Sequence, residues 1–180
     1  EDLLKKPEKV RRDLCGTTLG FIPQNPMTAF NLHVPVGTQM SETFRKRLRL
    51  EKNAARKLSM DVLQKVNLLD TNRVYRSYPG QLSGGMLQRA TMAILIGLSP
   101  RYIFADEPTS ALDEENKAYL NQELTQMKQK AAILFVSHDD AAIRTLCDEL
   151  LVMQSGIIVE QWHNGRFVCP TPHKEWTKEF

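Results

Sequence analysis

From about Thr38 onward, apolar residues recur every four positions, the spacing that places them on one face of an α-helix. The members of this pattern are Met40, Phe44 and Leu48, and then Leu58, Val62 and Val66. Residues 77–80, Ser-Tyr-Pro-Gly, interrupt the pattern and lead into a helix from Ser83 that is apolar on all sides from Ala90 to Ile96. A helix without a polar face is normally buried. The pattern therefore predicts a mainly helical segment over residues 27–100.

Short apolar runs flank this helical segment. Residues 17–23, 102–105 and 132–137 are almost continuously apolar, which is typical of strands buried on both faces of a sheet. A helix is predicted from Asp113 to about Gln129, between the last two runs. Because strands joined by a crossover helix run in the same direction, the pattern predicts a parallel sheet in an α/β fold, with helices covering both faces.

A further helix, capped by Asp139 or Asp140, leads to a C-terminal hairpin. Its strands are residues 150–154 and 157–162, and Ser155-Gly156 forms the turn between them. Three segments are thus expected along the chain. Residues 1–26 supply a core strand, 27–100 a helical subdomain, and 101–180 the C-terminal part of the core.

Composition and charge narrow the class of protein. The chain has 180 residues, of which 42% are hydrophobic and 25% charged, and this is ordinary for a globular domain with a real core. No apolar stretch approaches the ~20 residues of a membrane span, and we expect neither an anchor nor a signal peptide. Cys15, Cys147 and Cys169 lack metal-ligand spacing, so reduced thiols in a cytosolic protein are expected.

The net charge is only +3, and the basic residues gather between Arg45 and Lys57. A solvated helix face is the favoured interpretation of this run, and a surface for anionic lipid or nucleic acid is the alternative.

Two segments carry candidate chemistry. A helix that starts with Ser83-Gly84-Gly85 offers bare backbone N–H groups and a positive dipole end to an anion. Asp106 and Glu107 follow the apolar strand directly, where carboxylates could hold a metal ion and act as a base. Since Pro108 follows, we expect Glu107 to be extended. Singly, each feature also has a structural explanation, because an acid at a strand end often caps the backbone.

His138 follows the apolar run 132–137 and precedes two acids. A lone histidine there is more often a local hydrogen-bonding cap than a catalyst. However, parallel strands end at the same edge of a sheet, where ligands bind. We therefore expect His138 to lie near Asp106 and Glu107, within reach of one phosphate.

A phosphate-binding loop of the form G-x-x-x-x-G-K-[ST] is absent, because none of the nine glycines is followed by Lys. We therefore expect these 180 residues by themselves to bind ATP poorly and to hydrolyse it negligibly.

The motifs resemble those of the nucleotide-binding domain of ABC transporters. Residues 82–86, Leu-Ser-Gly-Gly-Met, match the LSGGQ signature except that Met86 replaces Gln, and Ile103 to Glu107 match the Walker B strand. The resemblance implies a P-loop NTPase-like (ABC ATPase) core, incomplete at its N-terminus, with an inserted α-helical subdomain. The sequence is similar to the C-terminal two-thirds or so of such a domain.

The resemblance also implies roles for individual residues. Glu107 is the catalytic base and His138 the switch that contacts the γ-phosphate, while Asp106 and the Q-loop residue Gln24 approach Mg²⁺. Asp113 belongs to the D-loop and would also serve as a helix N-cap. The signature residues face ATP bound by the opposite subunit, and they are Ser83, Gly84, Gly85 and Met86.

Residues 24–31 resemble the Q-loop run of the peptide and nickel importer branch. This implies an ATP-hydrolysing subunit for uptake of oligopeptides, dipeptides or nickel and metallophores, peripheral at the cytoplasmic face of the membrane. Implied partners are transmembrane permease subunits, a second ATP-binding subunit as homodimer or heterodimer and, indirectly, a periplasmic or extracellular solute-binding protein. No nucleic acid is expected.

Two other functions stay open: a non-transport ABC-type ATPase of DNA repair or translation, and a binding fragment without hydrolysis. The interval between Gln24 and Ser83 has room for a compact helical subdomain but not for the long coiled coils of repair ATPases. Glu107 and His138 are both present, which disfavours the fragment.

A surface for the permease is predicted next to the Q-loop. Residues 27–30 and the helix with Met40, Phe44 and Leu48 should form a groove for a cytoplasmic helix of the permease. The alternative is that these side chains fill the core of the helical subdomain itself, since their spacing serves either purpose.

Overall fold

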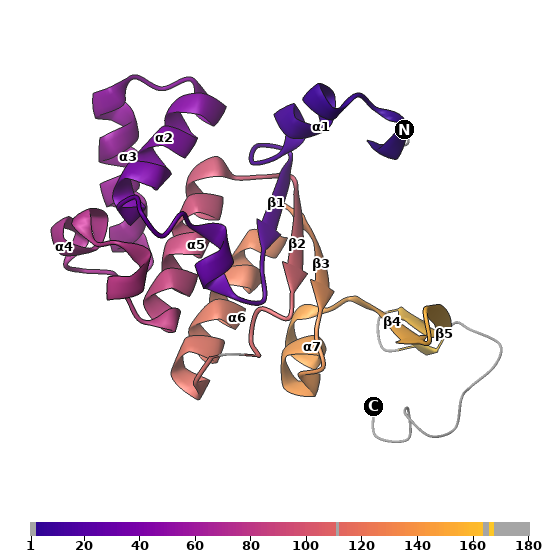
Figure 1. Ribbon diagram of the computed structural model, residues 1–180. Coiled ribbons are helices and arrows are strands. Elements are labelled where there is room, and N and C mark those ends of the chain that lie inside the picture. Colours follow the sequence, from indigo (N-terminus) through magenta and orange to yellow (C-terminus); the bar gives the residue numbers. More distant parts are fainter. Residues whose placement is uncertain (1–2, 111, 164–165, 168–180) are drawn as a thin grey trace. The chain divides into compact units, whose positions relative to one another are not determined.

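Three parallel strands form the centre of the first part of the chain in the computed structural model, which describes residues 3–110, 112–163 and 166–167 (Figure 1). They are β1 (Leu19–Ile22), β2 (Tyr102–Asp106) and β3 (Ala132–Val136), in the order β1-β2-β3. The register places Phe21 beside Phe104 and Phe104 beside Leu134. The α6 helix (Glu114–Lys128) connects β2 to β3. The predicted parallel sheet is therefore confirmed.

One face of this sheet is buried and the other is open. Ile22, Ile103 and Ala105 point to the buried face. The alternate positions point the other way, and their side chains are between 45% and 58% exposed: Phe21, Tyr102, Phe104, Leu134 and Val136. Within the described residues 3–138, no element packs over this second face, so helices cover only one face of the sheet in this unit rather than the two that were expected.

The helical segment follows a short 3₁₀ turn, η2 (Pro26–Ala29). It contains α2 (Val36–Leu48), α3 (Lys52–Lys65), α4 (Thr71–Arg76), η3 (Pro79–Gln81) and α5 (Gly84–Leu98). Met40, Phe44, Val62 and Leu63 are fully or almost fully buried and form its core. The predicted helices are confirmed, whereas α4 has no counterpart in the sequence-based prediction.

Two short helices precede β1, namely η1 (Leu3–Lys5) and α1 (Glu8–Leu14). Among the helices that the structure describes, none combines the length and apolar character of a membrane span.

The described residues from Asp139 onward, 139–163 and 166–167, belong to a second compact unit. Its described elements are α7 (Asp140–Leu146), β4 (Glu149–Gln154), β5 (Ile157–His163) and β6 (Arg166–Phe167). Asp139 is the N-cap of α7, and its side chain accepts a hydrogen bond from the Ala142 N–H. Ser155 and Gly156 both have positive φ, at 50° and 79°, as the tight turn of a hairpin requires. The predicted hairpin is confirmed. Cys169 lies outside the described residues.

Candidate functional site

Glu107 and His138 meet at the carboxyl end of the parallel sheet. Glu107 follows the last residue of β2, and its N–H donates to the Val136 carbonyl at the end of β3, 2.8 Å away. His138 Nδ1 lies 2.8 Å from Glu107 Oε2. The two atoms are close enough for an ion pair when the imidazole is protonated, but they are not aligned as a hydrogen bond. The topology therefore brings together the two residues that the sequence singled out, as expected.

The backbone of Glu107 differs from the prediction. It has a φ of 44°, in the left-handed region, whereas Pro108 was expected to hold it extended. The turn after β2 explains the difference, because the Glu107 carbonyl accepts from both the Ser110 N–H (3.2 Å) and the Ser110 hydroxyl (2.9 Å). A non-glycine residue in this region costs about 1–2 kcal/mol. Such strain is common where a side chain must be held in one direction for function.

Asp106 is the last residue of β2, and Gln24 lies two residues beyond the end of the neighbouring strand β1. Ile22 pairs with Ala105 in the register, so Asp106 and Gln24 both leave the sheet at its carboxyl edge, and both are exposed. Their carboxylate and amide oxygens are the donor type that Mg²⁺ prefers, and Mg²⁺ usually takes only one or two protein ligands beside phosphate and water. No cluster of three or more His, Cys, Asp or Glu residues suited to a metal ion occurs in the described part of the chain. A magnesium site at Asp106 and Gln24 stays a prediction.

A hollow of about 130 Å³ connects three of the predicted motifs. Its walls come from the segment after β1, from the first turns of α5 and from the turn after β2. The residues that line it are Gln24, Asn25, Pro26 and Met27 from the first segment, Gly84, Leu87 and Gln88 from the second, and Pro108 and Leu112 from the third. The motifs are thus neighbours in space although they are far apart in the sequence.

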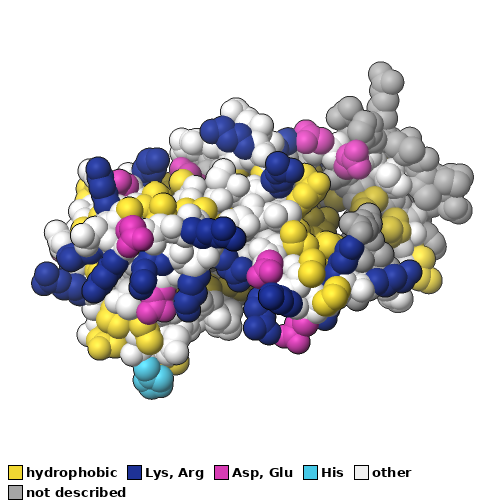
Figure 2. Space-filling model, turned by 90° about the horizontal axis from the view of Figure 1, so that it is seen from above, with side chains coloured by type: hydrophobic (Ala, Val, Ile, Leu, Met, Phe, Trp, Pro, Cys, Tyr) yellow, Lys and Arg dark blue, Asp and Glu magenta, His cyan; other side chains and the backbone are white. Residues whose placement is uncertain are grey.

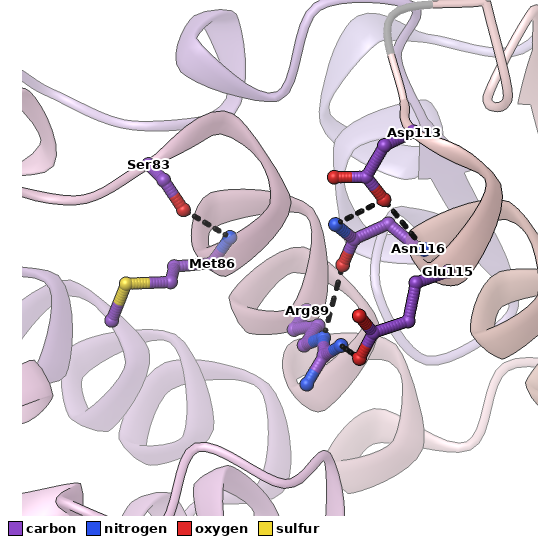
Figure 3. Close-up of polar contacts among 6 residues, drawn as sticks. All are labelled: Ser83, Met86, Arg89, Asp113, Glu115 and Asn116. Carbon is purple, nitrogen blue, oxygen red and sulfur yellow. Dashed lines mark hydrogen bonds and ion pairs between the residues drawn. The ribbon is translucent and has the colours of Figure 1, made fainter.

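Ser83 is the N-cap of α5, and its hydroxyl oxygen accepts a hydrogen bond from the Met86 N–H at 3.2 Å (Figure 3). Ser83 and Gly84 are exposed, and a Cβ added to Gly84 would meet no atom within 4 Å. An anion could therefore approach this turn. Gly85 and Met86 are half-buried. A Cβ on Gly85 would lie 2.7 Å from Asn116 Nδ2, so this second glycine faces protein.

Asp113 is the N-cap of α6, as predicted, and its Oδ1 accepts from the Asn116 N–H at 2.9 Å. The same oxygen accepts from the Asn116 side-chain amide at 2.8 Å. Asn116 Oδ1 in turn accepts from Arg89 Nε on α5, at 3.3 Å (Figure 3). Asn116 and Arg89 thus link Asp113 to the α5 helix.

Sequence reasoning missed this link, because no motif marks Asn116. The spacing of Gly85 and Arg89, one helical turn apart, would have placed both on one face of α5 but could not identify what packs there.

Arg89 is itself held on two further sides. Its guanidinium lies over the Tyr119 ring, 4.7 Å from the ring centre, and 4.0 Å from Glu115. Burial raises the pKa of the Tyr119 hydroxyl, and the neighbouring Glu123 carboxylate raises it further. The hydroxyl therefore stays protonated, and the ring stays neutral beneath the cation.

The predicted permease groove is wrong for its central residues. Met40 and Phe44 are fully buried and Phe30 is nearly so. A Cβ added to Gly97 on α5 would lie 2.5 Å from Phe44 Cζ, which shows how closely the ring packs against that helix. These side chains fill the core of the helical subdomain, which was the alternative that their spacing left open.

Basic side chains lie at the surface over α2 and α3, with acidic ones among them (Figure 2). Arg45 and Lys46 are exposed, and Lys46 Nζ lies 3.8 Å from Glu42 Oε2. Exposed, partly paired charges fit the favoured interpretation of a solvated helix face.

Comparison with known proteins identifies the family to which the chain is similar. The family model described as "ABC transporter" matches residues 6–110. A probable D,D-dipeptide transport ATP-binding protein of Escherichia coli K12 is 38% identical over 165 residues, which are 89% of this chain and 49% of that protein. A glutathione import ATP-binding protein of Pectobacterium atrosepticum is 35% identical, over 96% of this chain and 28% of the relative.

A metal-staphylopine import system ATP-binding protein of Staphylococcus aureus is 32% identical, over 98% of this chain and 65% of its own length. The chain thus spans about half the length of several curated relatives, and less of some.

A solved structure has the same fold. It is a dimeric ATP-binding cassette in a post-hydrolysis state bound to ADP and Pi, with a TM-score of 0.77 at 21% identity. The alignment covers 89% of this chain and 68% of the cassette. An α/β fold of the ABC ATPase type, predicted above, is therefore confirmed.

Proposed function

Because the chain belongs to the ABC transporter family, we propose that it supplies the hydrolytic and signature elements of an ATP-hydrolysing importer subunit. The observation that carries this proposal is the 2.8 Å contact between Glu107 and His138 at the carboxyl edge of the sheet. An acid and a histidine from neighbouring strands converge there, in the region where parallel α/β sheets bind their ligands.

Glu107 is the general base in this proposal. Its half-buried carboxylate takes a proton from the water that attacks the γ-phosphate of ATP. Hydrolysis of a phosphoanhydride depends mainly on positioning and charge stabilisation, which suits a side chain held by a strained turn. His138 is exposed and near enough to Glu107 to hold the attacking water or the phosphate beside it.

Asp106 and Gln24 would hold Mg²⁺ in the same subunit, directly or through water. The bound ion would neutralise part of the negative charge of the phosphates. Both side chains lie at the carboxyl edge of the sheet, and Gln24 also lines the hollow next to α5.

The signature residues would act on a second subunit. Ser83 and Gly84 present an open helix start, and they would contact the γ-phosphate of ATP held by another ATP-binding subunit, together with Gly85 and Met86. Dimers of related cassettes support this arrangement. Asp113 would lie at the same dimer contact, since it is tied to α5 through Asn116.

The relatives' names support a solute of the dipeptide, oligopeptide, glutathione or metal–metallophore class. The subunit would then work at the cytoplasmic face of the membrane with transmembrane permease subunits, and a solute-binding protein would deliver the solute from outside. Exposed residues after the Q-loop, such as Thr28 and Leu32, are better placed to touch a permease than the buried Phe44.

The test replaces the base without changing its shape. In the assembled transporter, Glu107→Gln should lower ATP hydrolysis at least about 100-fold, because the amide cannot take up a proton. ATP binding should be unchanged within about twofold. Phosphate release and calorimetry measure the two quantities.

Glu51→Gln is the matched control, because Glu51 is exposed and its side chain makes no capping hydrogen bond at α3. It should leave both quantities unchanged. If Glu107→Gln keeps most of the hydrolysis, Glu107 is not the base.

A further inference from the structure

Asn116 lies in the first turn of α6, and its side chain packs against the first turn of α5 at Gly85. A Cβ on Gly85 would come within 2.9 Å of its Cγ and Oδ1 and within 2.7 Å of its Nδ2. Its amide group is used at both ends, since Nδ2 donates to Asp113 and Oδ1 accepts from Arg89. The short asparagine side chain thus supplies one donor and one acceptor, and this contact uses both.

The two glycines of the signature turn therefore have different reasons to be glycine. Gly84 faces open space, so the absence of a side chain there leaves room for a ligand. Gly85 faces Asn116, so the absence of a side chain there allows the two helices to approach. Real Cβ atoms do not come as near as 2.7 Å to another heavy atom, and an alanine at Gly85 would push Asn116 away.

We propose that Asn116 is a positioning residue that locks Asp113 to the glycine turn of α5, so that both present themselves to the second subunit as one rigid unit. The proposal rests on the proposed function, in which Ser83, Gly84 and Asp113 act across the dimer contact.

Arg89 is the second anchor of this unit. Its side chain is mostly buried, with 19% exposed, and its Nε donates a hydrogen bond from α5 to the side-chain oxygen Oδ1 of Asn116. The Tyr119 ring fixes the guanidinium from below. Asn116 therefore cannot turn away from Gly85 without giving up contacts on both helices.

A double-mutant cycle tests the contact without any nucleotide. On the 180-residue chain, Gly85→Ala should lower the thermal midpoint by at least about 4 °C, because the added methyl displaces Asn116. In the background of Asn116→Ala, the same Gly85→Ala change should cost nothing or raise the midpoint, since the clash is gone and alanine favours helix.

Gly84→Ala is the matched control, because the same substitution one position earlier meets no atom. It should not lower the midpoint in either background. If Gly85→Ala fails to fold alone, a folded double variant supports the contact, and an unfolded double variant overturns it. Additive effects of the two substitutions also overturn it.

The positioning role needs a kinetic test in the assembled transporter. Asn116→Ala should lower kcat about 10-fold while KM for ATP stays within twofold, because the ATP seat is intact and only the opposing surface is loosened. Asn116→Asp keeps the size and the acceptor for Arg89 but loses the donor to Asp113, so it should lower kcat at least as much.

Wild-type kcat in both variants, with normal folding, would show that Asn116 is merely structural. The outcome is separable from that of the proposed function. Loss of the proposed function would appear as an active Glu107→Gln variant, whereas failure of the Asn116 proposal leaves Glu107→Gln inactive.

Discussion

At the scale of single residues, burial is the main cause of the raised pKa values of Tyr119 and Glu123, which lie one turn apart on α6. Burial raises the pKa of the Glu123 carboxyl above its ordinary value of 4.5. The folded protein therefore binds a proton at Glu123 more tightly than the unfolded chain does. This contribution to stability is complete below about pH 4.5 and is lost as the pH rises through the folded-state pKa.

Glu123→Gln should consequently be stabilising at neutral pH. The amide carries no charge, so the half-buried site no longer has to hold a carboxylate next to Tyr119. The midpoint of thermal unfolding should exceed that of the wild type at pH 7, and the difference should shrink as the pH falls towards 4. Glu51→Gln, at an exposed carboxylate, should show no such pH-dependent gain. A constant difference from pH 4 to pH 7 would contradict the assignment.

The meeting of Glu107 and His138 could be predicted from the sequence, because strand direction alone places both at one edge of the sheet. The left-handed backbone conformation of Glu107 could not be predicted in this way. The rule for residues before proline favours extended conformations, but the two hydrogen bonds from Ser110 to the Glu107 carbonyl override it. Asn116 was also hidden, because its role depends on how closely two helices approach, and that distance is a tertiary property.

At the scale of elements, periodicity identified the long helices and the hairpin. The α4 helix escaped because six residues, fewer than two turns, show no repeat, and only the Asp70 cap signals its start. The sequence also could not tell what covers the apolar face of a helix. Four-residue spacing in α2 defines one apolar stripe but does not tell whether a partner protein or the chain's own core covers it.

Phe44 and Leu32 make this distinction measurable. Phe44→Ala should lower the free energy of unfolding by about 3–5 kcal/mol, because it leaves a cavity beside Gly97. Leu32→Ala removes a side chain that is exposed in the segment between η2 and α2, so it should change the free energy of unfolding by less than about 0.5 kcal/mol. Urea denaturation of both variants provides the comparison. If both variants lower the free energy of unfolding by an equally small amount, Phe44 lies at the surface and the groove interpretation is correct.

At the scale of the whole molecule, the parallel sheet is the notable feature. Parallel strands are almost always covered on both faces, and the near-continuous apolar character of β2 and β3 follows that rule. The apolar strands therefore predict a core on both sides of the sheet, whereas the described residues 3–138 cover one side. The open face follows the pleat, with Phe21, Phe104 and Leu134 in one register row.

Substitutions on the two faces of β2 should therefore behave differently in the isolated chain. Ile103 is 1% exposed, and Ile103→Ala should lower the free energy of unfolding by about 2–5 kcal/mol. Phe104 is the next residue but is 45% exposed, so Phe104→Ala should cost less than about 1 kcal/mol. The same Phe104→Ala change should also reduce the binding of a hydrophobic dye, because it trims an exposed apolar patch. If Phe104→Ala destabilises the chain as much as Ile103→Ala, a second layer covers this face in solution, and the one-sided sheet is not the state that folds.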